Sequence, residues 1–319
     1  MVVRTVMGFL ISLACIFVFM PPFIRFLKRI SFNQSVSEYS LEEFQMKAKT
    51  PIMGGILFII VPVIVSLVSV PDAFHDLDLI IVLLTFVGYG IIGFIDDYLI
   101  AVKKNNDGLK AWAKFLLQVI LAFAVFLLYR EDAGLSVTLL FSRKSIHLGF
   151  FYIILILFMF SGASNAVNLT DGMDGLAAGC EVFALLPYFL FAYRQGQYSI
   201  SVFVACLLGA LAGYLHFNIH PAKIFMGDTG SLSLGAVLAA LAMVLKKELS
   251  LIVIGGVFVL ETLCVIIQIG SVKLRGKRVF PYTPIHYAFV VKGIPEEKVV
   301  RYFWVCAILF AMIGYYIAY

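Results

Sequence analysis

The chain has 319 residues, of which 62% are hydrophobic and 13% are charged. Because soluble globular domains usually carry about 25% charged residues, this composition excludes a soluble protein and indicates an integral membrane protein. The net charge of +5 gives no reason to expect nucleic acid as a partner, since membrane topology accounts for the positions of most basic residues.

Apolar segments follow one another along the chain, and each can form a membrane-crossing helix. Such a helix needs about 20 predominantly apolar residues. The sequence predicts ten of them, at about 7–24, 51–70, 79–95, 112–129, 149–163, 175–193, 199–216, 229–245, 250–271 and 299–318. The loops between them are short, so we expect an all-α integral membrane protein with a single polytopic domain over residues 1–319.

The basic residues predict the orientation of these helices. With ten spans both termini lie on one side, and with the termini outside, 17 lysines and arginines fall on the inner side and 7 on the outer side. Since cytoplasmic loops carry the excess of Lys and Arg, both termini are predicted on the outer, periplasmic or extracellular, side. The predicted cytoplasmic loops are approximately 25–50, 96–111, 164–174, 217–228 and 272–298.

Three polar clusters lie at predicted cytoplasmic ends of the spans. They are Asp96-Asp97, then Asn165-Ala166-Val167-Asn168-Leu169-Thr170-Asp171-Gly172-Met173-Asp174-Gly175, and Phe225-Met226-Gly227-Asp228-Thr229-Gly230. Carboxylates beside hydrocarbon are costly without a partner, so together the clusters indicate a site for cations and phosphates. If the segment from Asp171 is helical, Asp171 and Asp174 share one face.

Each cluster also has a structural explanation. A hydrated helix end accounts for Asp96-Asp97 taken alone, and N-capping of the sixth span accounts for one acid of the second cluster but not for the whole set. Adjacent carboxylates repel, which raises the pKa of one of them unless a cation is near. That property suits a general base or a magnesium site.

Other ionisable residues are less specific. Glu248 and the other acids of the outer loops have no glycine-rich or amide-rich context, and we interpret them as solvated surface. Glu181 and Glu261 lie inside spans, where hydrogen-bonded structural roles are favoured over a proton path. His286 lies in the basic inner loop between Lys273 and Lys298, where it suits either a lid over a nucleotide or a structural role.

Four motifs, taken in order, resemble those of the polyprenyl-phosphate N-acetylhexosamine-1-phosphate transferases. They are Lys-x-x-Thr-Pro-x-Met-Gly-Gly at 47–55, Asp-Asp-Tyr at 96–98, Asn-x-x-Asn-Leu-Thr-Asp-Gly-x-Asp-Gly-Leu at 165–176 and Phe-Met-Gly-Asp-Thr-Gly-Ser-Leu at 225–232. The likeness runs from about residue 20 to the C-terminus, and residues 292–304 resemble the phospho-N-acetylmuramoyl-pentapeptide-transferase branch.

The resemblance implies a fold and a reaction. It implies ten transmembrane helices in the bacterial inner (plasma) membrane, an active site that faces the cytoplasm, Mg²⁺ and a homodimer. It also implies transfer of phospho-MurNAc-pentapeptide from UDP-MurNAc-pentapeptide to undecaprenyl phosphate, which gives lipid I and UMP.

By motif position, the resemblance also assigns roles to residues. Asp228 would bind magnesium, Asp96 would be the base for the lipid phosphate, and Asp96, Asp97 and Asp171 are further metal candidates. Asp97 and His286 complete the catalytic candidates, and Phe225 would stack on uracil. The remaining substrate-binding candidates are Lys47, Lys114, Asn168, Asp171, Gly172, Met173, Asp174, Asn218, Ser231 and Gln268. One departure is His286-Tyr287-Ala288, where this branch usually has three histidines.

Two other functions stay open at this point. One is transfer of GlcNAc-1-phosphate from UDP-GlcNAc to the same lipid, which the shared motifs also fit. The other is an ion-coupled transporter that uses the acids as a cation site. A transporter of this size should pair intramembrane acids across internal repeats, and the sequence has no obvious repeat.

Overall fold

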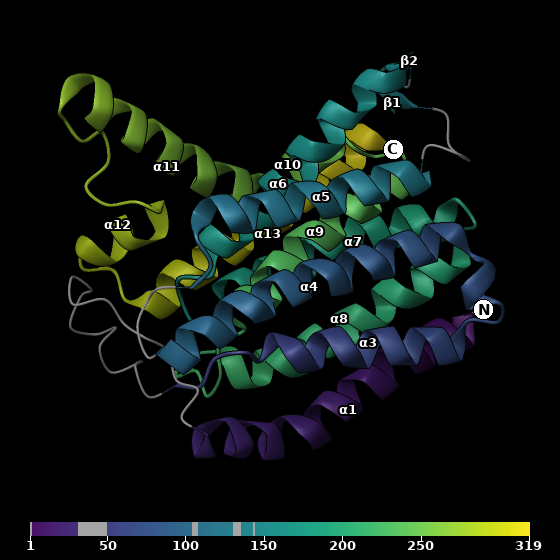
Figure 1. Ribbon diagram of the computed structural model, residues 1–319, viewed down its shortest axis with the longest axis horizontal. Coiled ribbons are helices and arrows are strands. Elements are labelled where there is room, and N and C mark those ends of the chain that lie inside the picture. The colour runs from purple at the N-terminus through teal and green to yellow at the C-terminus, as the bar shows by residue number, and fades with distance from the viewer. Residues whose placement is uncertain (1, 31–49, 104–107, 130–134, 143) are drawn as a thin grey trace.

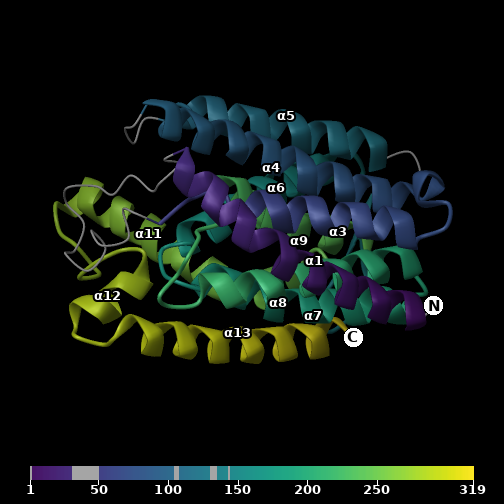
Figure 2. The same ribbon diagram turned by 90° about the horizontal axis from the view of Figure 1, so that it is seen from below.

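The computed structural model describes residues 2–30, 50–103, 108–129, 135–142 and 144–319. Its long helices run side by side in one bundle (Figure 1, Figure 2). The helices are α1 (Val2–Arg29), α3 (Gly55–Ser69), α4 (Leu77–Lys103), α5 (Ala111–Tyr129), α6 (Tyr152–Thr170), α7 (Leu176–Arg194), α8 (Tyr198–Asn218), α9 (Gly227–Val244), α10 (Ser250–Ile254), α11 (Gly256–Arg275), α12 (Ile285–Val291) and α13 (Glu296–Ala318).

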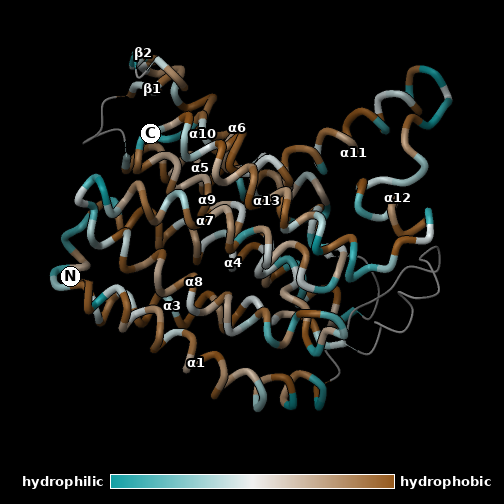
Figure 3. Tube along the Cα trace, turned by 180° about the vertical axis from the view of Figure 1, so that it is seen from behind, coloured by the Kyte–Doolittle hydropathy of each residue, from teal (hydrophilic) through white to brown (hydrophobic). Residues whose placement is uncertain are grey.

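The bundle confirms the prediction of a helical membrane protein. In the described residues, nine helices are long and apolar enough to cross a membrane, and α3 is a shorter apolar helix of 15 residues. Hydrophobic residues predominate along the length of the helices, and hydrophilic residues are more frequent near the helix ends (Figure 3). Both termini lie at the end of the bundle opposite α12 (Figure 1). The side of the membrane that this end faces stays a prediction.

Helix α9 lies in the centre of the bundle, where it packs against α4 and α6. All of its residues from Thr229 to Val244 are buried. Its sequence is rich in glycine, alanine and serine, and such small residues let neighbouring helices approach closely in a membrane protein. The first turn of α9, which carries Asp228, is therefore held by helices on several sides.

Several helices continue beyond the apolar segments that predicted them. The fifth span was expected to end at residue 163, but α6 continues to Thr170 and includes Asn165 and Asn168. Likewise, α4 contains Asp96 and Asp97 and ends only at Lys103. These polar residues stay helical because their side chains bind neighbouring helices, as described below. The expected ninth span is divided at Gly255 into α10 and α11.

The described chain also contains elements that the sequence did not predict. Strand β1 (Ser136–Thr138) pairs antiparallel with β2 (Ser145–His147), so the fold is not entirely helical. Short 3-10 helices cover η2 (Ala73–His75) and η3 (Gly149–Phe151). The loop expected at 272–298 contains α12, which lies between the end of α11 and the start of α13 (Figure 1).

The interpretation of the outer acids as solvated surface is wrong for Glu248, which is buried. Glu248 is only 1% exposed, and its Oε1 accepts a hydrogen bond of 2.5 Å from the Tyr152 hydroxyl. The Lys246 ammonium lies nearby, over the ring of Tyr129 at 4.8 Å from its centroid. Burial raises the pKa of Glu248 and lowers that of Lys246. The partner Tyr152 is distant in sequence, so the loop composition gave no sign of this contact.

Candidate active site

The start of α9 is fixed by Asp97 of α4. The Asp97 carboxylate accepts hydrogen bonds from the backbone N–H of Asp228 at 3.0 Å and of Thr229 at 2.9 Å, and from the Thr229 hydroxyl at 2.6 Å. The first N–H groups of a helix have no partner within the helix, so a carboxylate there stabilises the helix start. Asp97 is buried, and its carboxylate oxygens hold the backbone of Asp228 in place.

Two glycines allow α4 and α9 to come this close. A side chain at Gly93 would collide with the backbone of Asp228, and one at Gly227 would collide with the Asp97 carboxylate. Gly227 also has a φ of 69°, a left-handed conformation that glycine adopts without a steric penalty. The Gly-Asp-Thr sequence therefore meets a local requirement of the fold.

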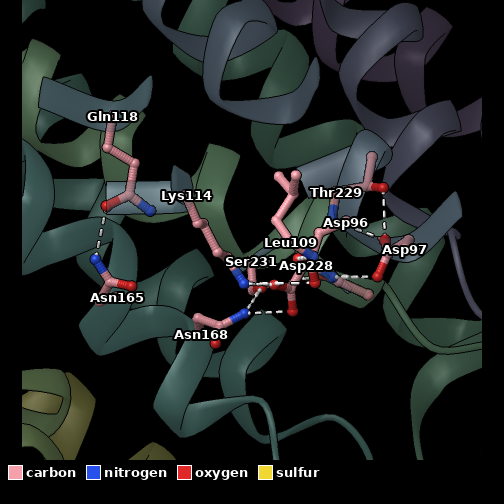
Figure 4. A network of polar contacts seen from close by, with 11 residues as sticks. Asp96, Asp97, Leu109, Lys114, Gln118, Asn165, Asn168, Asp228, Thr229 and Ser231 are labelled. Atoms are coloured by element: carbon pink, nitrogen blue, oxygen red, sulfur yellow. Dashed lines mark hydrogen bonds and ion pairs between the residues drawn. The ribbon is translucent and has the colours of Figure 1, made fainter. Parts of the chain in front are cut away.

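The Asp228 carboxylate is surrounded by polar side chains from α5 and α6 (Figure 4). Lys114 donates to its Oδ2, and Asn168 Nδ2 donates to its Oδ1 at 2.7 Å. The same Asn168 nitrogen donates to the Ser231 hydroxyl at 2.9 Å, and that hydroxyl donates to the carbonyl of Gly227 at 3.0 Å. Two of the predicted residues, Lys114 and Asn168, thus contact the predicted metal ligand, and Ser231 contacts Asn168.

Asp96 completes this group from the side of α4. Its Oδ2 lies 3.5 Å from Lys114 Nζ, and its Oδ1 accepts the backbone N–H of Leu109 at 2.7 Å. The Lys114 ammonium therefore contacts the carboxylates of both Asp96 and Asp228. A cavity of about 500 Å³ adjoins them and is lined by Asp96, Ile100, Gly108, Leu109, Ala111, Lys114, Phe115, Gln118 and Asn165.

The donor set fits a hard divalent cation. Magnesium prefers oxygen ligands and usually binds through one or two carboxylates together with substrate phosphates. Asp96 and Asp228 supply such carboxylates, and a positive charge already lies between them in the form of Lys114. Asp97 is less suited, because its oxygens accept the α9 hydrogen bonds.

A turn between α6 and α7 carries the next predicted residues. Residues 171–175 are not helical, so Asp171 and Asp174 do not share a helical face. The buried Asp174 accepts the N–H of Ala222 at 3.0 Å and lies 3.1 Å from His220 Nδ1. Asn218 joins the same junction by accepting the N–H of Gly175 at 3.1 Å. These hydrogen bonds hold the turn against the segment after α8.

The segment that contains Phe225 is paired with the entry to α3. Phe225 N donates to the carbonyl of Pro51 at 2.9 Å, and Gly54 N donates to the carbonyl of Phe225 at 2.8 Å. The first and last of the four motifs therefore lie side by side in space. Lys47, which belongs to the first motif, lies outside the described residues.

His286 is buried at the start of α12. The Glu261 carboxylate of α11 lies 3.0 Å from His286 Nδ1 and accepts the backbone N–H groups of Ile285 at 2.7 Å and His286 at 3.2 Å. These contacts confirm the hydrogen-bonded role expected of Glu261. The same expectation is wrong for Glu181, because neither of its buried carboxylate oxygens has a hydrogen-bond partner among the described residues. Gln268 accepts the N–H groups of Val279 and Phe280, so it holds the preceding loop.

Helix α12 packs directly on the 171–175 turn. A side chain at Gly172 would collide with the His286 ring, and the Tyr287 hydroxyl donates to the carbonyl of Gly172 at 3.0 Å. Burial raises the pKa of Tyr287, which keeps its hydroxyl protonated as a donor. Tyr287, in place of the usual histidine, thus serves as a contact between the loop and the turn that carries Met173.

Eight of the predicted residues therefore fall into two groups. Asp96, Lys114, Asn168, Asp228 and Ser231 meet around one carboxylate, whereas Asn218, Gln268 and His286 organise loops. Sequence reasoning did not select Gln118, although a lone amide four residues after Lys114 in an apolar helix is a usable signal.

Comparisons with known proteins show the family of this chain. Residues 79–246 match glycosyl transferase family 4. The phospho-N-acetylmuramoyl-pentapeptide-transferase of Geobacillus thermodenitrificans (strain NG80-2) is 47% identical over 320 residues, which cover 99% of this chain and 97% of the relative. The enzyme of that name from Geobacillus kaustophilus (strain HTA426) is 45% identical over 99% of this chain and 97% of its own. Another, from Staphylococcus aureus (strain bovine RF122 / ET3-1), is 44% identical over 97% of each chain. The chain therefore belongs to the phospho-N-acetylmuramoyl-pentapeptide-transferases within glycosyl transferase family 4.

Proposed function

We infer that this chain transfers phospho-MurNAc-pentapeptide from UDP-MurNAc-pentapeptide to undecaprenyl phosphate, with lipid I and UMP as products. The observation that carries the inference is the Lys114 ammonium held between the carboxylates of Asp96 and Asp228, among helices of a membrane protein. A phosphate on a lipid can reach such a site from the bilayer. A nucleotide sugar can reach it from the water.

The reaction forms one phosphorus–oxygen bond and breaks another. An oxygen of undecaprenyl phosphate attacks the phosphorus next to the sugar, and the bond from that phosphorus to the bridging oxygen breaks as UMP leaves. We propose that Asp96 accepts the proton of the attacking phosphate. Lys114 lowers the charge repulsion between the two phosphate groups, which is the main barrier to this kind of transfer.

Magnesium, when bound, would neutralise charge that develops on the phosphates. We propose Asp228 as its main ligand, with Asp96 and Asp171 as further candidates. In this proposal Asp97 positions a metal ligand and does not bind the metal itself. It holds the N-terminal turn of α9 and so places Asp228 opposite Lys114.

We propose that the donor lies on the side of the 171–175 turn and Phe225. Phe225 would stack on uracil, with Lys47, Gly172, Met173 and Asp174 around the nucleoside. Asn218 and Gln268 would support this side through the loops that they hold. The site would face the cytoplasm of a bacterial cell from its plasma membrane, and the chain would act as a homodimer.

An assay with two donors tests the function. Purified protein is given undecaprenyl phosphate and Mg²⁺ with either UDP-MurNAc-pentapeptide or UDP-GlcNAc, and release of UMP and formation of the lipid product are measured. We expect product from the first donor alone. Product from UDP-GlcNAc alone would assign the sibling reaction, and lack of product from both would contradict transferase activity.

A further inference from the structure

A pair of carboxamides lies one helical turn beyond Lys114 and Asn168 (Figure 4). Gln118 follows Lys114 on α5 by four residues, and Asn165 precedes Asn168 on α6 by three. One turn of helix is about 5.4 Å. Asn165 Nδ2 donates to Gln118 Oε1 at 2.9 Å, and both residues line the cavity that adjoins Asp96.

The orientation of the Gln118 amide follows from its neighbours. Asn165 Nδ2 also donates to the backbone carbonyl of Ser161 at 2.8 Å. A carbonyl only accepts hydrogen bonds, so the Asn165 atom that faces it must be nitrogen. The Gln118 atom that faces the same nitrogen must then be the oxygen, which leaves Gln118 Nε2 as the free end of the amide.

The free end of Gln118 is a buried donor that lacks a partner. Gln118 is 0% exposed, and its Nε2 has no hydrogen-bond partner among the residues that the structure describes. Tyr89 of α4 donates to the backbone carbonyl of Gln118 at 2.9 Å, which fixes this part of α5. Because a buried donor without a partner is costly, the site calls for a ligand that brings an acceptor oxygen.

The surroundings indicate which ligand this is. Lys114 and Gln118 present donors from one face of α5, and the same cavity has apolar walls at Ile100 and Phe115. A ligand with anionic oxygens and an apolar tail fits this combination. Gln118 also lies one turn farther than Lys114 from the N-terminus of α5, toward the apolar middle of this helix.

We propose that Gln118 binds a non-reacting oxygen of the polyprenyl phosphate acceptor, and that Asn165 is a positioning residue that fixes the Gln118 amide. This assignment rests on the proposed function and names the residues that receive its lipid substrate. The donor diphosphate carries similar oxygens, so the experiment varies each substrate separately.

The first test replaces Gln118 while keeping its size. Gln118→Leu should raise the apparent KM for undecaprenyl phosphate about tenfold, with the KM for UDP-MurNAc-pentapeptide unchanged, because a hydrogen bond to a charged group is lost. Gln118→Glu should raise it further, since a carboxylate beside the phosphate adds repulsion. Gln197→Leu, the same replacement at the N-terminus of α8, is the matched control and should behave as wild type.

The second test reverses the amide without removing it. The carboxylate of Asn165→Asp accepts hydrogen bonds, so it should draw Gln118 Nε2 away from the cavity and raise the acceptor KM about as much as Gln118→Leu. Asn165→Ser, which keeps a donor, should restore part of the affinity. A residue that only packs would not distinguish these two variants.

Binding without turnover separates this assignment from the transferase reaction. Undecaprenyl phosphate added without donor should raise the Tm of the wild type and of Gln197→Leu, and should raise that of Gln118→Leu much less. Gln118→Met serves if the leucine variant does not fold. An increase confined to the donor KM, equal Tm shifts in all variants, or lack of a shift in the wild type would each overturn the assignment. Lack of lipid product in the wild type contradicts the reaction alone.

Discussion

Two polar regions of this molecule are built in different ways. Around Asp228, side chains of α4, α5, α6 and α9 contact one another and border a cavity. Around His286, the side chains of Glu261 and Gln268 mainly bind backbone groups of the segment before and at the start of α12. The first region places charge where a ligand can meet it, and the second uses polar groups to hold a loop.

We expect the residues around Asp228 to take part in the reaction and the residues around His286 to position a loop. Changes of charge around Asp228 should alter the rate and leave the fold intact, because each helix is held by its buried apolar face. Changes around His286 should shift α12 relative to the 171–175 turn. They should therefore alter the affinity for the donor, which we propose to bind beside this turn. Changes of charge around Asp228 should therefore lower kcat, whereas substitutions around His286 should raise the KM for the donor.

The largest effect is expected at Asp228. Asp228→Asn keeps the shape of the side chain but removes the charge that attracts Lys114 and a magnesium ion, so the rate should fall roughly a thousandfold. UMP release at limiting Mg²⁺ measures this. The exposed residue Asp72 offers a matched control, since Asp72→Asn should leave the rate unchanged. Near wild-type turnover of Asp228→Asn would show that the metal assignment is wrong.

A somewhat smaller loss is expected at Asp96. Asp96→Asn removes the proposed base, and general bases contribute about 10²–10⁴-fold to a rate. The kcat should fall about a hundredfold while UDP-MurNAc-pentapeptide still binds, as measured by calorimetry. If donor binding is lost and single-turnover chemistry is unchanged, Asp96 belongs to the binding site instead.

An effect of about tenfold is expected at His286. His286→Ala removes the ring that pairs with Glu261 and packs on Gly172, so the turn that carries Met173 loses its support. The KM for the UDP-linked donor should rise about tenfold, which corresponds to about 1.4 kcal/mol, with little change for undecaprenyl phosphate.

Gly172→Ala acts on the same contact from the other side. Its added methyl group collides with the His286 ring, so the single variant should resemble His286→Ala. The double variant should be little worse than either one, because both remove a single contact. A defect confined to undecaprenyl phosphate would place the loop on the lipid side of the site.

The smallest effect is expected far from both regions, at Glu248. Burial raises its pKa above the ordinary value of 4.5, so the folded protein holds this proton more tightly than the unfolded chain. The resulting stability is complete below pH 4.5 and is lost as the pH rises through the raised pKa of the folded state. Glu248→Gln should remove this pH dependence, keep the Tyr152 contact and leave activity unchanged. Tm measured across this pH range, with Asp72→Asn as the control, would detect it.

Local sequence predicted the existence of the helices far better than their ends. Apolar length identifies α6, but its last turns carry Asn165 and Asn168, whose partners Gln118 and Asp228 come from other helices. The burial of Glu248 and the pairing of His286 with Glu261 depend on contacts 96 and 25 residues apart in sequence. The motifs did select Asp96 and Asp228, and the family resemblance selected Lys114, which meets both in space. The roles assigned to them stay predictions.

The short helix α3 has a consequence for the shape of the membrane around the protein. Its 15 residues span about 22 Å, whereas the hydrocarbon core of a bilayer is about 30 Å thick. Residues 51–54 precede α3 and are buried, and Pro51 and Gly54 pair with the backbone of Phe225. We expect this segment to supply the missing depth. Irregular backbone is tolerated at that depth only inside protein. On the proposed function, we therefore expect the donor nucleotide to bind near Phe225 at a level below the lipid headgroups.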